Sequence, residues 1–276
     1  MLKLRPKRIR VGISLGSVVV TASQGLWRQT NHIVAVRSVP AEKTGVFQYL
    51  CDMLSGIVTE HGLQSSTASI IISDALMRQW LVEPPSNVSS LDDLRAAAAS
   101  RFQSIFGESP VQWEIRADWQ SARPFLAAGL PQVYVQALNT SLNACRLQSE
   151  SICQQTVVAL NRWGSRLSAG SWLVLYQDGR ATILVLDGQA ALAGLRQVQC
   201  GPQEIANESS FTQFLQLQAM LMGVPFPPII QIPDLIMELA WLRFVKGTQP
   251  QFRVLQKALP KDGLLSSGAA LALAGA

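Results

Sequence analysis

Residues 10–23 of the chain read Arg-Val-Gly-Ile-Ser-Leu-Gly-Ser-Val-Val-Val-Thr-Ala-Ser. Two largely apolar runs, residues 9–15 and 18–22, lie on either side of a step at Gly16 and Ser17. Valine, isoleucine and threonine dominate both runs, and these residues favour β-strands. Because only a short glycine-containing step separates them, the pattern predicts two strands joined by a tight turn.

A third strand and a helix are predicted next. Residues 33–37, Ile-Val-Ala-Val-Arg, come at the spacing of a three-stranded meander. Apolar residues then recur at helical spacing over residues 46–57 and predict an amphipathic helix. Strand, glycine turn, strand, strand and helix form the opening half of the actin/hexokinase-type nucleotide fold. In that fold the glycine turn lets backbone N–H groups approach a phosphate, and a carboxylate ends the first strand. Ser14 occupies the carboxylate position here.

The same order of elements is predicted a second time. Residues 172–176 lead through a Gly179 turn into residues 181–186, a further run covers 189–198, and an amphipathic helix begins near Phe211. Ser14-Leu-Gly16 therefore matches Gln177-Asp-Gly179, which indicates an internal repeat. The sequence predicts an α/β, actin/hexokinase-like two-lobed fold with duplicated ribonuclease-H-like lobes, at residues 1–165 and 166–276.

A small inserted subdomain is predicted within the first lobe. Two prolines at residues 84–85 break the chain, and Ser90 has the position of a helix N-cap with acidic residues following it. Residues 111–119 alternate with the period of a strand, and residues 125–130 are also strand-like. These features predict an αββ insert at about residues 84–130.

The chain resembles PilM and its relatives, the actin-like components of type IV pilus and pilus-like assembly systems. PilM-type chains open on G-I-D-[IL]-G-S and a valine-rich strand, and here residues 12–20 read Gly-Ile-Ser-Leu-Gly-Ser-Val-Val-Val. The family's second-lobe pattern D-x-G-x-x-T falls on Gln177, Gly179 and Thr182. A small-residue closing segment at 267–273, which includes Gly268, is similar as well. The cytoplasmic part of the type II secretion L-protein has a similar order of elements.

The resemblance implies a cytoplasmic scaffold at the inner membrane. In PilM-type proteins a short N-terminal peptide of a single-span, PilN-like partner lies between the core of lobe one and an inserted subdomain. The matching surface here would be bounded by the 84–130 insert and residues 70–80. Trp80 or Trp113 could then serve as an aromatic anchor for the partner. The alternative reading places Trp113, Trp119, Trp163, Trp172 and Trp241 in the core.

The resemblance also implies a nucleotide site, and the residues present indicate that it is degenerate. Mg²⁺ in phosphoryl transfer is held largely by carboxylates, which neither Ser14 nor Gln177 supplies. Asp178 sits one position late, and the strand at 229–232 runs into Pro233 rather than a glycine pair. We therefore expect a pseudo-ATPase without catalytic residues or cofactor. The degenerate loops comprise Ser14, Gly16, Ser17, Gln177, Gly179, Thr182 and Gly268.

Alternatives to the scaffold remain open. The runner-up is a weak ATP-binding or ATP-hydrolysing actin-like protein whose cleft still switches between open and closed states. An active ATPase or sugar kinase of the same fold is another class, and a carboxylate at residue 14 or 177 would have favoured it. A type II secretion L-protein-like component is another reading. The Gly16 and Gly179 turns, taken singly, could also be ordinary hairpins with no ligand.

Composition narrows the classes of partner. Of 276 residues, 48% are hydrophobic and 15% charged, as in folded globular proteins. The net charge is +5, and five of the 23 basic residues lie within the first ten. This N-terminal segment could contact anionic lipid or an acidic partner. The remaining charge nearly balances, so we expect no nucleic-acid binding.

No metal site or membrane span is predicted. The four cysteines form no C-x-x-C pair, and only two histidines accompany them. No run reaches the roughly 18–20 apolar residues that a spanning helix needs. The basic N-terminus lacks the apolar region of a secretory signal, so a cytoplasmic location is expected.

Overall fold

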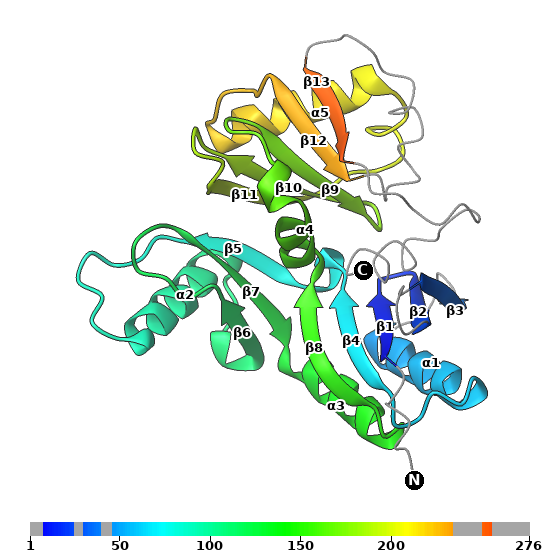
Figure 1. Ribbon diagram of the computed structural model, residues 1–276. Coiled ribbons are helices and arrows are strands. Elements are labelled where there is room, and N and C mark those ends of the chain that lie inside the picture. The colour runs from blue at the N-terminus through cyan, green and yellow to red at the C-terminus, as the bar shows by residue number, and fades with distance from the viewer. Residues whose placement is uncertain (1–7, 25–29, 40–45, 234–249, 256–276) are drawn as a thin grey trace. The chain divides into compact units, whose positions relative to one another are not determined.

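The computed structural model describes residues 8–24, 30–39, 46–233 and 250–255 (Figure 1). The chain divides into two compact units. One contains Met1–Met77, Leu130–Arg162 and Gly263–Ala276, and the other contains Arg78–Gly129 and Trp163–Asp262. Among the described residues no helix is long and apolar enough to cross a membrane.

The first unit is built on a five-stranded sheet with the order β3-β2-β1-β4-β8. Its elements are β1 (Arg8–Ile13), β2 (Ser17–Gln24), β3 (Thr30–Ser38), α1 (Val46–Glu60), β4 (Thr67–Ile72), α3 (Gln132–Ala144), β8 (Gln148–Gln154) and α4 (Gln155–Trp163). Strands β1, β2 and β3 pair antiparallel, whereas β4 is parallel to both β1 and β8. The predicted meander and helix are therefore confirmed.

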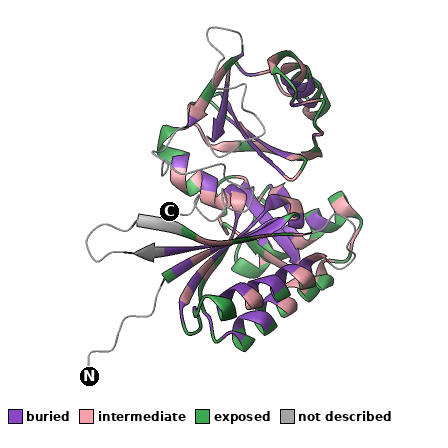
Figure 2. Ribbon diagram, turned by 90° about the vertical axis from the view of Figure 1, so that its right-hand side faces the viewer, coloured by how far each residue is buried: buried purple, intermediate pink, exposed green. Residues whose placement is uncertain are grey.

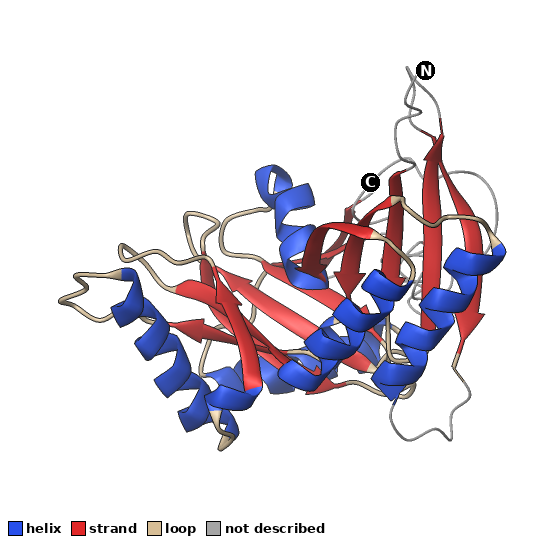
Figure 3. Cartoon of the chain, turned by 90° about the horizontal axis from the view of Figure 1, so that it is seen from below, coloured by secondary structure: helices blue, strands red, loops and turns tan. Residues whose placement is uncertain are grey.

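Helices α1 and α3 lie side by side on one face of this sheet (Figure 3). Alternate residues of β1, namely Ile9, Val11 and Ile13, point to this face and are fully buried. The two helices meet through Phe47 and Tyr134, whose rings stack with centroids 4.3 Å apart. Each helix is thus buried along one side and exposed along the other (Figure 2).

The second five-stranded sheet repeats the first, with the order β11-β10-β9-β12-β13. Its elements are β9 (Trp172–Gln177), β10 (Arg180–Leu186), β11 (Leu192–Gln199), α5 (Glu208–Met222), β12 (Ile229–Pro233) and β13 (Gln251–Leu255). The strand directions also match, since β9 pairs antiparallel with β10 and parallel with β12. The internal repeat read from the sequence is confirmed strand by strand, and each copy has its own apolar core.

A separate three-stranded sheet, ordered β5-β7-β6, packs against one helix. Its elements are β5 (Arg78–Val82), α2 (Leu91–Phe106), β6 (Trp113–Ala117) and β7 (Phe125–Pro131). Ser90 caps α2 as predicted, and the Asp93 carboxylate accepts hydrogen bonds from Ser89 and Ser90 that lower its pKa to about 2. We refer to residues 78–131 as the inserted subdomain.

The inserted subdomain corrects two details of the prediction. The expected helix and two strands are present, but β5 precedes the predicted start and makes the third strand of the sheet. Val111, assigned to a strand from its alternation, lies instead in a 3-10 turn, η2 (Pro110–Gln112), and is 77% exposed. Strand β6 begins only at Trp113.

Other expectations have a different outcome. Strands β8 and β13 were not predicted. The helix expected over residues 235–245, Gly268 and the basic residues 3–7 lie outside the described residues. The lobes at 1–165 and 166–276 stay a prediction, although a change of unit falls between Arg162 and Trp163.

Candidate functional site

The first candidate site is the turn between β1 and β2, which brings together Ser14, Gly16 and Ser17. The backbone N–H of Ser14 donates to the carbonyl of Ser17 at 2.9 Å, and the N–H of Ser17 donates to Ser14 Oγ at 3.0 Å. The two hydroxyl oxygens are 3.1 Å apart, and both side chains are buried. The Ser14 side chain therefore closes the turn and occupies the N–H of Ser17.

Gly16 is not required by the fold. Its φ is not positive, and a Cβ built at this position would meet nothing within 4 Å. Neither backbone strain nor crowding among its neighbours therefore explains a glycine here.

The second candidate site is the hairpin between β9 and β10. Gln177 pairs with Arg180, which leaves Asp178 and Gly179 as a two-residue loop. Both residues have positive φ, 53° and 70°, as a type I′ turn requires, and Asp-Gly is a favoured pair for that turn. The Gly179 carbonyl accepts from the backbone N–H of Cys200 at 2.9 Å. Turn geometry alone therefore accounts for Asp178 and Gly179.

Gln177 and Thr182 flank this hairpin and are both buried. Thr182 pairs with Leu175 in the register of β10 against β9. The two candidate loops thus occupy equivalent places in the repeat, after the first strand of each sheet. In both places an uncharged polar side chain, Ser14 or Gln177, stands where the fold's nucleotide-binding members carry an acid.

Carboxylates do not gather at either loop. No group of three or more His, Cys, Asp or Glu residues in the described part of the chain could hold a metal ion. The thiols of Cys51 and Cys200 are buried, and burial raises the pKa of each to about 12. At neutral pH both are therefore protonated and unreactive.

One functional candidate was missed from the sequence. Asp74 follows β4 directly, is 4% exposed, and accepts hydrogen bonds from the backbone N–H of Thr156 at 3.1 Å and from Thr156 Oγ1 at 2.6 Å. The neighbouring Ser73 N–H donates to the Ile13 carbonyl at 2.8 Å, so Asp74 belongs to the same sheet edge as Ser14. The signal in the sequence was Ser73-Asp74 at the end of a buried strand. Its carboxylate is engaged by the first turn of α4.

The proposed aromatic anchors lie together on one face of the inserted sheet. Trp80 is 2% exposed, and its Nε1–H donates to the carbonyl of Ala98 in α2 at 3.2 Å. Trp80 and Trp113 both contact Phe102, with ring centroids 5.1 and 5.2 Å apart. A Cβ at Gly129 would lie 3.2 Å from Trp113, so this glycine makes room for the rings. Trp80 is therefore a core residue, which does not suit the anchor role suggested for it, whereas Trp113 is partly exposed.

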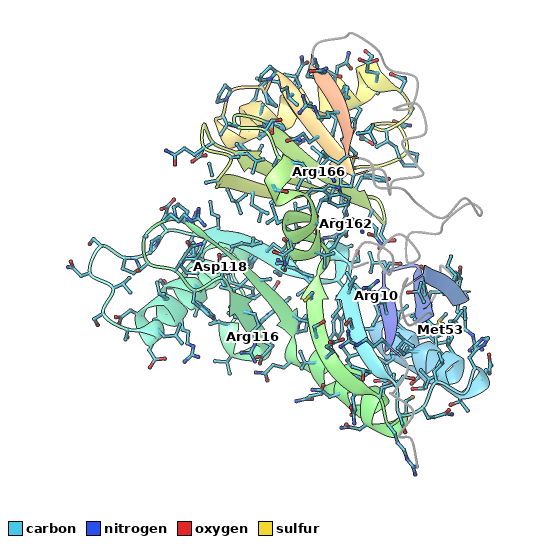
Figure 4. The ribbon with its side chains drawn as sticks, in the orientation of Figure 1. Arg10, Met53, Arg116, Asp118, Arg162 and Arg166 are labelled. Atoms are coloured by element: carbon cyan, nitrogen blue, oxygen red, sulfur yellow. The ribbon has the colours of Figure 1, made fainter. Side chains whose placement is uncertain are left out.

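Arg8 and Arg10 are the described part of the basic N-terminal segment. Arg10 projects from β1 (Figure 4) and is partly buried, which lowers its pKa, while Glu150 opposes that shift. Arg8 forms a salt bridge with the same Glu150 at 3.4 Å. One carboxylate thus offsets part of the positive charge where the segment enters the sheet.

No protein-family model and no curated protein matches this chain. Similar solved structures include a Bacteroides thetaiotaomicron protein with an actin-like ATPase fold and unknown function. It is 10% identical, with a TM-score of 0.59, and the match covers 92% of this chain and 94% of that one.

Two further similar structures come from assembly systems. A chain of the PilM–PilN type IV pilus biogenesis complex is 10% identical, with a TM-score of 0.58 and coverage of 83% of this chain and 81% of that one. The cytoplasmic domain of EpsL, an inner membrane component of the type II secretion system of Vibrio cholerae, is 11% identical, with a TM-score of 0.55. That match covers 97% of this chain and 94% of that domain. The chain thus has the actin-like, two-lobed α/β fold that its resemblance to PilM-type proteins predicts.

Proposed function

We propose that this protein is a cytoplasmic scaffold of a type IV pilus or pilus-like assembly complex at the inner membrane. It docks the N-terminal segment of a membrane-anchored, single-span partner that resembles PilN. The likeness of its fold to a chain of the PilM–PilN complex and to the EpsL domain supports this proposal. The match along nearly the whole EpsL domain also favours the second candidate, a type II secretion L-protein-like component.

The scaffold role is supported mainly by the β1–β2 and β9–β10 loops, which are closed by their own hydrogen bonds and turn geometry and lack the expected acids. The Ser14 hydroxyl already holds the Ser17 N–H in the first loop, and a tight type I′ turn forms the second. Neither Ser14 nor Gln177 brings negative charge to hold Mg²⁺, which otherwise bridges the phosphates of ATP. A fold kept without its metal ligands is suited to binding a partner, and catalysis is not its function.

Calorimetric titration tests the degenerate site. We expect that ATP–Mg²⁺ does not bind with a micromolar or tighter dissociation constant and that no phosphate is released above background. The reason is that neither residue 14 nor residue 177 is a carboxylate. Ser14→Asp with Gln177→Asp is the matched variant, since it places an acid at both positions, and we expect it to gain at most weak, metal-dependent binding. Tight, metal-dependent binding by the unchanged chain would sink the pseudo-ATPase proposal and favour an active nucleotide switch.

Contact of the basic N-terminal segment with anionic lipid is a second, separable part of the proposal. Exposed charges are screened over a Debye length of about 8 Å at physiological ionic strength, so binding to anionic vesicles should fall as salt rises. Co-sedimentation with phosphatidylserine vesicles measures this, and replacing Lys3, Arg5 and Lys7 by Gln should remove it. Arg146→Gln, which removes one positive charge from the turn before β8, is the control for a loss of charge outside the segment. If vesicle binding does not depend on salt concentration, or if the triple variant still binds, the segment does not bind lipid through its charge.

We propose that the partner docks on the inserted subdomain. Its core tryptophan, Trp80, is not available as an anchor, but Trp113 is partly exposed and the neighbouring Val111 is 77% exposed. Aromatic residues dominate the energetics of interfaces, and extended peptides gain main-chain hydrogen bonds at strand edges. Strand β6, which carries Trp113, is an edge strand of its sheet.

A further inference from the structure

A buried carboxylate fixes the place where two distant segments of the first unit meet. Strands β4 and β8 run parallel with Ile72 opposite Gln154, so the chains leave the sheet side by side. Asp74 and Thr156 each follow two residues later and are both buried. A carboxylate that loses contact with water is tolerated only when hydrogen bonds replace the water.

Thr156 supplies two of these hydrogen bonds, from its backbone N–H at 3.1 Å and from its hydroxyl at 2.6 Å. The backbone N–H of Asp74 lies 3.5 Å from the side-chain oxygen of Gln155, which reinforces the junction in the opposite direction. Hydrogen bonds to a charged group are about twice as strong as neutral ones. The Thr156 N–H is also one of the donors at the start of α4 that have no partner within the helix, and a negative charge is favoured there.

The position of this pair along the chain gives it a role beyond capping. The chain passes from the first unit to the second between Met77 and Arg78, three residues after Asp74. It passes again between Arg162 and Trp163, at the end of the helix that begins beside Thr156. The short turn η1 (Asp74–Leu76) and α4 therefore each join the pair to a crossing point.

We propose that the Asp74–Thr156 pair is a clamp that couples these two crossing points, so that a change at the start of β5 is transmitted to α4. Thr156 is thus a positioning residue for the link between the inserted subdomain and the second repeat. The clamp is independent of a pilus or secretion function, because Asp74 and Thr156 both lie in the first unit.

Hydrogen exchange of the full-length chain tests the clamp. Thr156→Val keeps the shape but removes the hydroxyl, and we expect faster exchange both in residues 74–77 and in residues 157–162, by about tenfold or more for a lost charge-assisted bond. Thr156→Ser should restore the wild-type rates. Ser69→Ala removes a side-chain contact to Glu150 between the same two strands and should change neither segment.

A double variant separates a clamp from a simple helix cap. Arg78→Ala removes the 3.2 Å salt bridge with Glu108 at the start of β5. We expect it to accelerate exchange in α4 when Thr156 is present and to have no further effect in a Thr156→Val background. If Thr156→Val accelerates only α4, or if the effects of the two changes simply add, Thr156 is no more than a cap and the coupling is refuted.

Discussion

A chain in which a short Gly-Ser linker replaces residues 78–129 should lose recruitment of the proposed membrane-anchored partner while its second repeat stays folded. The inserted subdomain has its own apolar core, centred on Trp80, Phe102 and Phe125. The core of the second repeat is made of other residues, including Trp172, Phe211 and Ile230. Removing the first core therefore leaves the second complete. Pull-down with the partner's N-terminal segment measures recruitment, and near-ultraviolet circular dichroism of the buried aromatic residues measures folding.

The structure changes the boundaries that this experiment needs. A deletion of residues 84–130, as the sequence suggests, would leave β5 without β7, its antiparallel neighbour. The unpaired backbone N–H and C=O groups of β5 would then promote aggregation, and aggregation would itself abolish partner binding. Cutting at residues 78 and 129 removes β5 and all but the last two residues of β7, so loss of binding can be attributed to the missing surface.

A pair of point variants provides the matched control. Val111→Asp places a charge on the inserted subdomain at a side chain that is 77% exposed, and Met220→Asp does the same on α5 at one that is 79% exposed. Neither change disturbs a core, and only Val111→Asp should weaken recruitment. A partner that still binds without residues 78–129, or that responds only to Met220→Asp, would show that docking occurs elsewhere.

Much of the fold could be predicted because the strands and helices of each repeat have apolar patterns formed by residues close together in the sequence. In β1 every second residue is apolar and buried, β9 is an apolar run buried along its whole length, and the helices that follow keep one apolar face. Such periodic burial depends on neighbouring residues in the sequence, so it can be read without knowing what packs against it. The Ser90 cap of α2 was equally readable, since its partner Asp93 is three residues away.

The missed strands lacked this local signal. Strand β8, Gln-Ser-Glu-Ser-Ile-Cys-Gln, is mostly polar and largely exposed at the edge of its sheet. It is a strand because it pairs in parallel with β4 through backbone hydrogen bonds. Ile72 of β4 lies opposite Gln154 of β8, so the two strands are far apart in the sequence. Strand β13 depends in the same way on β12. Strand propensity depends strongly on such context, so composition alone did not predict either strand.

The features of the candidate site also differ in whether they depend on residues near in the sequence or far apart. The missing acids at residues 14 and 177 are a matter of residue identity and could be read once the repeat was aligned. The engagement of Asp74 by Thr156 could not, because 82 residues separate the two. Whether a tryptophan is buried or exposed likewise depends on the helix that covers it, so the sequence alone did not exclude Trp80 as an anchor.

Replacing Trp80 by Ala should destabilise the inserted subdomain by about 3–5 kcal/mol, the usual cost of deleting a large buried aromatic side chain. The ring lies against Phe102 and Phe106, and its Nε1–H donates to the Ala98 carbonyl, so the change leaves a cavity between β5 and α2. Urea denaturation followed by circular dichroism, with hydrogen exchange of the α2 amides, measures the loss.

Trp80→Phe separates packing from hydrogen bonding in the same place. It keeps an aromatic ring against Phe102 and removes the Nε1–H donor, so it should cost less than Trp80→Ala by at least about 1 kcal/mol. Exchange of the α2 amides should rise strongly in Trp80→Ala and modestly in Trp80→Phe. If Trp80→Ala instead left stability unchanged and weakened only partner binding, Trp80 would be a surface anchor after all, and the core described for the inserted subdomain would be wrong.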